Sequence, residues 1–372
     1  MLRRLFLGVS AGLIVGILIV QLAGLARGGE RPHTRLVAED ASAPLRRIAI
    51  HYAPGADPRA LPVWRQLFAV LPAAVDVDVE VAQAADFDRL LARLRSAGTP
   101  HLGRLHRVVV GAPITTWSRD RYAALVDDRG GGSILAPPRI ETPFPQRAGD
   151  MRSPSAISRA LYGGEPRIAE IVFEGGDLAA TPRWVFADAN LAGRNLGRIA
   201  AADRASIERA LRRHLGQELV WLGDAVGDVP RHHIMMYMMP IDDRTVAVGD
   251  VRAGVRLLGD APLALDDVEL QARRFDRAAA LLEARGFRVL RVPVAVLEGA
   301  GSYVTYTNAL FDRRGDTRII YLPTYDLPAL DAAGAAFWRD QGFEVHPIDV
   351  SSIYQLNGSL GCLVNVLARG EP

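Results

Sequence analysis

The sequence contains no lysine and only one cysteine. All 44 residues counted as lysine or arginine are arginine, which we attribute to genome composition rather than to function. The single cysteine, Cys362, excludes a disulfide bond within the chain. The formal net charge is only +2, so the sequence gives no electrostatic reason to expect a nucleic-acid partner. The 372 residues are 49% hydrophobic and 23% charged, which is typical of a folded globular protein with a buried core.

One long uncharged apolar run is present, at the N-terminus. It extends from Leu5 to Ala26, follows Arg3 and Arg4, and is long enough to span a bilayer as a helix. It predicts an N-terminal apolar helix that serves as a signal anchor or signal peptide over residues 1–27, with the rest of the chain outside the cytoplasm. No cysteine follows the run, which excludes a lipoprotein anchor. We expect membrane contact through this segment only, and a linker over the polar, turn-rich residues 28–44.

After the linker, short apolar segments alternate with amphipathic ones. Residues 47–52 are typical of a strand, and residues 58–71 are typical of a helix with Pro58 in its first turn. Residues 75–82 alternate valine with acids, which predicts a strand with one polar face. Units of this kind recur along the chain. They predict a single α/β domain over residues 45–370, with its chemistry on loops at the strand ends.

Two adjacent histidines begin a segment that is relevant to function. Residues 232–240 are predicted to form a strand, paired as a hairpin with residues 245–250. Alternate side chains of a strand face opposite sides, so His233 and Met235 would share one face and His232 would lie on the other. Only one of the two histidines would then enter a given site.

Cys362 lies in a run of small residues near the C-terminus. Gly358, Ser359 and Gly361 precede it, and small residues let the backbone approach a ligand closely. Two interpretations are open for this residue. Free cysteine is among the most buried residue types and often only fills a core, but it can also be a nucleophile. Polar clusters upstream favour the nucleophile.

Two of these clusters contain carboxylates suited to a cation. Glu174 follows a predicted strand and precedes two glycines, so it could bind a cation where the backbone bends sharply. The same sequence is also typical of a solvated acid in a turn, and this alternative is open. Asp120 follows Trp117, and an indole wall beside a carboxylate can receive a planar cation. A surface pair with Arg119, which would stabilise the fold little, is the alternative for Asp120.

The order of the clusters resembles that of a known family. The chain contains, in sequence, Trp117–Asp120 (WSRD), Phe173–Asp177 (FEGGD), His232–Ile234 (HHI) and a late cysteine after Asn357–Gly361 (NGSLG). This order is similar to the agmatine deiminase and bacterial peptidylarginine deiminase family, within the pentein or guanidino-group-modifying superfamily. The resemblance covers residues 46–369. It implies a five-bladed, pseudo-symmetric α/β propeller of ββαβ units.

The resemblance also implies roles for individual residues. Cys362 matches the nucleophile, and His233 matches the general acid/base. Glu174 matches the carboxylate that orients this histidine and contacts the guanidinium, and Asp120 matches a guanidinium-binding aspartate. Asn308 matches a position that lines the site in some members. The implied reaction is hydrolysis of a guanidinium through a covalent thiouronium intermediate, for which the family needs no cofactor and no metal.

Two positions depart from the family pattern. Met235 stands where the family has the aspartate of a His-x-Asp motif, and losing such a charge-assisted hydrogen bond costs about 1.5–3 kcal/mol. The loss is larger for a transition state that keeps the positive charge. On the strand geometry above, Met235 would occupy the space of the missing carboxylate in the substrate site. Gly361 stands where many members have histidine.

Three functions are compatible with these observations. The first is an extracytoplasmic cysteine hydrolase for an agmatine-like or peptidyl-arginine guanidinium, with a substrate altered by Met235; amidinotransfer is a variant of the same chemistry. The second is a degenerate relative that binds a ligand without turnover. The third is an extracytoplasmic copper protein, because Met235, Met236, Met238 and Met239 adjoin two histidines, and thioethers and imidazoles suit Cu(I). A methionine-rich core strand is the alternative to copper binding.

Overall fold

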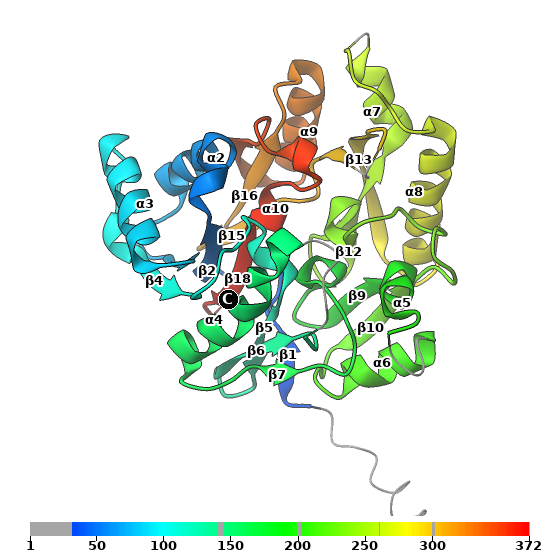
Figure 1. Ribbon diagram of the computed structural model, residues 1–372. Coiled ribbons are helices and arrows are strands. Elements are labelled where there is room, and N and C mark those ends of the chain that lie inside the picture. Colours follow the sequence, from blue (N-terminus) through cyan, green and yellow to red (C-terminus); the bar gives the residue numbers. More distant parts are fainter. Residues whose placement is uncertain (1–31, 140–144, 199–202, 260, 300–301, 372) are drawn as a thin grey trace, which may run out of the picture.

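The computed structural model describes residues 32–139, 145–198, 203–259, 261–299 and 302–371. The apolar helix predicted at Leu5–Ala26 lies outside these residues. Among the helices of the described ranges, none has both the length and the apolar character that a membrane span requires. The described strands form five separate sheets with helices packed against them (Figure 1).

Each of these sheets has three or four strands. The first contains, in pairing order, β1 (Thr34–Leu36), β5 (Ala123–Asp127), β6 (Gly132–Ala136) and β7 (Arg167–Ile168), and the second contains β10 (Glu218–Leu222), β9 (Trp184–Asp188) and β8 (Ala179–Ala180). The third contains β11 (Met238–Pro240), β12 (Thr245–Asp250), β13 (Arg288–Val296) and β14 (Tyr303–Thr305). The fourth contains β15 (Leu310–Arg314), β16 (Thr317–Thr324) and β17 (Phe343–Asp349), and the fifth contains β18 (Val364–Arg369), β2 (Leu45–Tyr52), β3 (Asp76–Val81) and β4 (Leu105–Val109).

Every sheet combines an antiparallel pair with a parallel pair. In the fourth sheet, β15 and β16 pair antiparallel, and β17 pairs parallel to β16 after the helix α9 (Pro328–Asp340). The other parallel pairs are connected through α2 (Asp57–Val70), α3 (Ala84–Ser96), α4 (Ser153–Tyr162), α5 (Ala189–Asn195), α6 (Arg204–Arg212), α7 (Val251–Leu258) and α8 (Val268–Glu283). Parallel strands require such crossover helices. The predicted α/β fold class is therefore confirmed.

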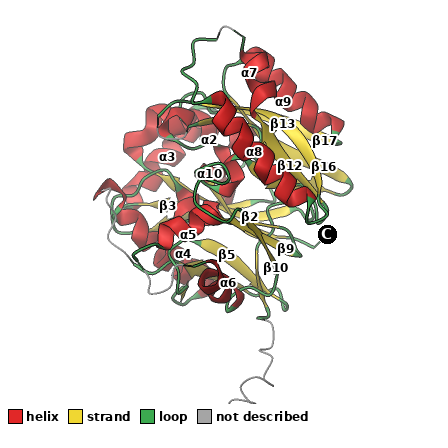
Figure 2. Cartoon of the chain, turned by 90° about the vertical axis from the view of Figure 1, so that its right-hand side faces the viewer, coloured by secondary structure: helices red, strands yellow, loops and turns green. Residues whose placement is uncertain are grey.

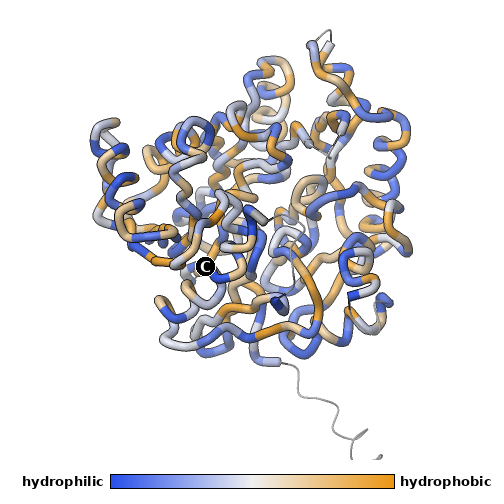
Figure 3. The backbone as a smooth tube through the Cα atoms, viewed as in Figure 1, coloured by the Kyte–Doolittle hydropathy of each residue, from blue (hydrophilic) through white to orange (hydrophobic). Residues whose placement is uncertain are grey.

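The helices pack one face on the sheets and expose the other. Figure 2 shows α8 and α9 alongside the strands β12, β13, β16 and β17. In Figure 3 the outer helices alternate between hydrophobic and hydrophilic residues along the chain. In α8, for example, Phe275, Ala279 and Leu282 are buried, and they recur at the three- and four-residue spacing of one helix face.

Local sequence signals account for several helix starts. Pro58 and Pro328 lie in the first turns of α2 and α9, where the absent N–H would have no helical partner anyway. Asp250 and Asp267 cap α7 and α8, because their side chains accept hydrogen bonds from backbone N–H groups three residues later.

One feature of the N-terminal half differs from the prediction. β1 lies within residues 28–44 and pairs with β5, so this part of the predicted linker belongs to a sheet. The strand with one polar face predicted over residues 75–82 is present as β3, and two acids of that face, Asp78 and Glu80, are buried. Asp78 accepts a hydrogen bond from Arg47, with an Nε–Oδ2 distance of 2.6 Å, and Glu80 accepts one from the Tyr122 hydroxyl at 2.6 Å. Each buried acid thus has a polar partner, as burial requires.

The strand predicted over residues 232–240 is wrong in its first half. His232 has a φ of 87°, and residues 234–236 form the short 3₁₀ helix η7 (Ile234–Met236). Only Met238–Pro240 pairs in a sheet, as β11. The alternation of faces assumed for His232, His233 and Met235 therefore does not apply.

Candidate active site

A cavity of about 410 Å³ brings together side chains that are far apart in the sequence. Its walls are formed by Trp117, Asp120, Gln146, Arg147, Glu174, Arg194, His232, His233, Leu356, Asn357 and Cys362. Five of the predicted site residues are among them: Trp117, Asp120, Glu174, His233 and Cys362. The other two, Asn308 and Met235, are buried and lie outside this lining.

Cys362 lies on the short helix α10 (Leu360–Leu363) directly before β18 and is 3% exposed. Its Sγ is 3.5 Å from Nδ2 of Asn308 and 3.9 Å from Sδ of Met236. Asn308 therefore lies behind the thiol and contacts it, without forming part of the cavity wall. The thiol has the cavity on one side and packed side chains on the other.

The small residues before Cys362 leave room for other side chains of the site. A Cβ on Gly358 would lie 2.3 Å from the Trp117 ring, so this glycine lets the indole pack against the loop. A Cβ on Gly361 would lie 2.9 Å from Oδ1 of Asn308, which leaves no space for a side chain. We expected these small residues to allow close approach of a ligand, but the atoms that approach them belong to Trp117 and Asn308.

His233 and Glu174 form a buried pair at one wall of the cavity. Nε2 of His233 is 2.9 Å from Oε2 of Glu174, and His233 is 5% exposed. Burial opposes the charged imidazole, but the nearby Cys362 and the hydrogen bond to Glu174 raise the pKa of His233 well above its usual value. Gly176 packs against the ring, because a Cβ there would lie 2.5 Å from Cγ of His233. The backbone of the FEGGD segment thus fixes both the acid and its partner.

Asp120 ends the 3₁₀ helix η3 (Ser118–Asp120) and is 4% exposed. Its Oδ2 accepts a hydrogen bond from Nη2 of Arg147. Burial raises the pKa of Asp120, the charge of Glu174 raises it further, and Arg147 opposes both. The two carboxylates expected to receive a guanidinium therefore lie near each other in the wall of one cavity.

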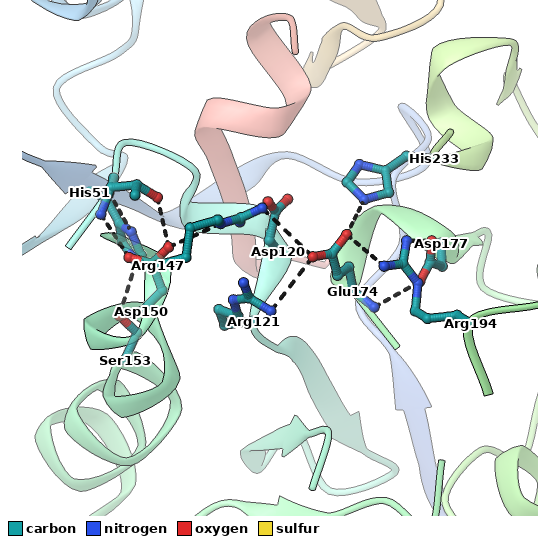
Figure 4. Close-up of polar contacts among 11 residues, drawn as sticks. His51, Asp120, Arg121, Arg147, Asp150, Ser153, Glu174, Asp177, Arg194 and His233 are labelled. Atoms are coloured by element: carbon teal, nitrogen blue, oxygen red, sulfur yellow. Dashed lines mark hydrogen bonds and ion pairs between the residues drawn. The ribbon is translucent and has the colours of Figure 1, made fainter. Parts of the chain in front are cut away.

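Three arginines surround these carboxylates, and the sequence analysis identified none of them. Nη1 of Arg121, Arg147 and Arg194 lies 3.5, 3.7 and 3.1 Å, respectively, from a carboxylate oxygen of Glu174 (Figure 4). Burial opposes ionisation of Glu174, but the His233 hydrogen bond and the Arg194 charge hold its pKa below the usual range. No local signal distinguishes these residues, because all 44 basic residues of the chain are arginine.

The two histidines and Met235 do not lie as the strand prediction required. Both His232 and His233 line the cavity, and their ring centroids are 4.7 Å apart with an interplanar angle of 73°. Burial and the charge of His233 lower the pKa of His232 to about 3, so this ring is neutral. Met235 is 1% exposed and packs near Gly361, behind the thiol. Met235 therefore does not take the space of a substrate-binding carboxylate.

The methionines belong to the hydrophobic core. Met235, Met236, Met238 and Met239 are all buried within it, and Met236 is the one whose sulfur contacts Cys362. In the part of the chain that the structure describes, no group of three or more His, Cys, Asp or Glu side chains is arranged to hold a metal. The methionine-rich core is therefore the interpretation that the packing favours.

Comparison with known proteins identifies the fold. No family model and no curated protein sequence matches the chain. Among solved structures, it is similar to the agmatine deiminase of C. jejuni, with 16% identity, a TM-score of 0.65, and coverage of 91% of this chain and 98% of that one. It is also similar to the agmatine deiminase of Enterococcus faecalis, with 14% identity, a TM-score of 0.65, and coverage of 92% and 98%. The chain therefore has the fold of these agmatine deiminases over nearly its whole described length.

Proposed function

We propose that the protein is a cysteine hydrolase that cleaves a C–N bond at the guanidinium carbon of an arginine-derived substrate. In this proposal Cys362 is the nucleophile, His233 is the general acid/base and Glu174 orients His233. Asp120 receives the planar cation against the Trp117 ring. The observation that carries the proposal is the convergence of these five side chains on one cavity, with Nε2 of His233 2.9 Å from Oε2 of Glu174.

The reaction would proceed in two steps. The Cys362 thiolate, stabilised by the protonated His233, attacks the guanidinium carbon. The C–N bond then breaks, and His233 gives its proton to the departing nitrogen, which leaves as ammonia. Water attacks the resulting S-alkylthiouronium and gives a proton to His233. The C–S bond breaks, which regenerates the thiolate and releases the ureido product, whose remaining hydroxyl proton passes to solvent and converts the released ammonia to ammonium.

The proposal has three further parts. The motif resemblance supports an agmatine-like or peptidyl-arginine substrate and a five-bladed propeller arrangement of the sheets. The N-terminal apolar run supports an extracytoplasmic location with anchoring by Leu5–Ala26. Besides the carboxylates, the cavity wall contains the apolar ring of Trp117 and the uncharged polar ring of His232. This surface can contact the part of the substrate that carries the guanidinium.

The experiment that tests the proposal measures product release. Purified protein is incubated with agmatine, free arginine and a blocked arginine peptide, and both ammonia and the ureido product are quantified. We expect turnover of one of these compounds, and we expect Cys362→Ala to abolish it while Ser352→Ala, at the surface, retains it. Mass spectrometry should find the covalent adduct on Cys362. Product release that survives Cys362→Ala refutes the proposal.

A second candidate function is ligand binding without turnover. It is favoured by the hydrogen bond between Arg147 and Asp120, which occupies a carboxylate that the substrate would need. This candidate predicts saturable binding of a guanidine with no ammonia and no adduct on Cys362.

A further inference from the structure

Arg147 presents to the site the same chemical group that the proposed substrate carries. Its side chain enters the cavity from the 3₁₀ helix η4 (Pro145–Arg147) and is 18% exposed there. Its Nη2 donates a hydrogen bond to Oδ2 of Asp120, and its Nη1 lies 3.7 Å from Oε1 of Glu174. A guanidinium from the chain itself therefore already contacts both carboxylates.

Arg147 is also anchored on the side away from the cavity. Its Nε lies 3.4 Å from Oδ2 of Asp150, which is fully buried. Asp150 accepts hydrogen bonds from N and Oγ1 of Thr115 at 2.7 and 2.6 Å. Figure 4 shows the Arg147 side chain extending from Asp150 toward Asp120 and Glu174. Its position is thus determined from both ends.

We propose that Arg147 is a specificity-determining residue: it occupies the cation site as an internal ligand, and a substrate guanidinium binds Asp120 only by displacing it. This inference rests on the proposed function, because in that proposal Asp120 is the carboxylate that binds the substrate guanidinium. Arg194 differs from Arg147 in this respect. It pairs with Asp177 and Glu174, and the structure gives it no contact with Asp120.

The consequence is selection against small guanidines. A bare alkylguanidinium offers Asp120 the same hydrogen bonds that Arg147 makes, so the exchange gains little. A productive substrate must gain its affinity from the rest of the cavity, which His232, Leu356, Asn357 and Trp117 line. The site therefore selects guanidines with a large tail over methylguanidine.

Binding measurements on Arg147→Gln test the inference directly. Titration calorimetry is carried out with methylguanidine and with its uncharged analogue N-methylurea, in the Cys362→Ala background so that no turnover occurs. We expect Arg147→Gln to lower the Kd of methylguanidine at least tenfold and to leave the Kd of N-methylurea unchanged. The matched control is Arg152→Gln, which removes a nearby arginine that donates to the Gly111 carbonyl instead. It should change neither Kd.

Two further variants make the result specific to the shared carboxylate. Adding Asp120→Asn to Arg147→Gln should abolish the gain, because the vacated carboxylate is then lost. Arg147→Lys keeps the positive charge and should bind methylguanidine as weakly as the parent protein. It controls for the possibility that any substitution at this position changes binding by disturbing the fold. An unchanged or raised Kd in Arg147→Gln overturns the inference, since Arg147 would then be no competitor.

Turnover of the Cys362-containing protein is measured separately, so the two proposals can fail independently. A tenfold gain in methylguanidine affinity without ammonia release in any variant refutes the hydrolase and supports the internal ligand. Ammonia release without that gain supports the hydrolase and refutes the internal ligand.

Discussion

Replacing Glu174 with glutamine should lower the pKa of His233 and shift the pH range in which the site is active. The carboxylate of Glu174 accepts a hydrogen bond from Nε2 of His233 at 2.9 Å. Burial opposes the charged imidazole, but the nearby Cys362 and the bond to Glu174 raise its pKa. Glutamine keeps the shape of the side chain and removes its charge. The protonated imidazole then loses its charged partner while it stays buried.

The size of the shift follows from the contacts. A hydrogen bond to a charged group contributes about 1.5–3 kcal/mol, and about 1.4 kcal/mol corresponds to one pKa unit. The pKa of His233 should therefore fall by about one to two units. Arg194, Arg121 and Arg147, which lie 3.1, 3.5 and 3.7 Å from the carboxylate, keep their charges in the variant and add to the fall.

The sign of the pH dependence is fixed by the direction of this shift. Because folding raises the pKa of His233, the His233–Glu174 pair stabilises the native state below the ordinary imidazole pKa. This contribution is lost as the pH rises through the raised pKa. In Glu174→Gln both the loss of stability and the loss of protonated His233 should occur at lower pH.

Nuclear magnetic resonance of histidine-labelled protein measures the pKa directly. The His233 signal, assigned with a His233→Asn variant, is followed between pH 5 and pH 10 in the native protein and in Glu174→Gln. Glu218→Gln is the matched control, because Glu218 pairs with Arg183 at the surface and should not affect His233. A His233 midpoint that is the same in native protein and in Glu174→Gln refutes the reasoning.

Two other substitutions test the packing of the site and of its support. Gly176→Ala places a Cβ 2.5 Å from Cγ of His233 and should reduce turnover about 100-fold by displacing the imidazole. Gly164→Ala is the control, because a Cβ there meets nothing within 4 Å and should leave turnover unchanged. Equal turnover of the two variants in steady-state assays contradicts this prediction. Tyr122→Phe removes the 2.6 Å hydrogen bond to the buried Glu80 and should lower the free energy of unfolding by about 1–3 kcal/mol in urea titrations. The half-exposed Tyr162→Phe serves as control, and the prediction fails if both variants unfold at the same urea concentration.

Much of the fold could be predicted from the sequence because local patterns determine it. The alternation of short apolar runs with amphipathic segments indicated an α/β domain, and Pro58 marked the first turn of α2. The convergence of Trp117, Asp120, Glu174 and His233 near Cys362 could be anticipated only from the order of motifs, because no spacing rule brings residues so far apart in sequence together.

The errors arise where tertiary contacts outweigh local pattern. The Val-acid alternation of β3 predicted its polar face, but the partners that let its acids be buried, Arg47 and Tyr122, could not be read from that pattern. The apolar run after His232 indicated a strand, but the φ of 87° at His232 turns the chain into η7. The sequence around Arg147 contains no motif that distinguishes it from the other arginines, so its contact with Asp120 could be found only in the folded structure.

The pairing of β18 with β2 has a consequence for how the protein is made. Cys362 directly precedes β18, and that strand finds its partner in β2, which leaves the ribosome roughly three hundred residues earlier. Until β18 pairs with β2, α10 lacks the strand that holds its C-terminal end, whereas Asp120, Glu174 and His233 lie in segments already synthesised. A polypeptide that stops before β18 therefore lacks one of the anchors of Cys362, and we expect the proposed nucleophile to be organised only after this strand has paired.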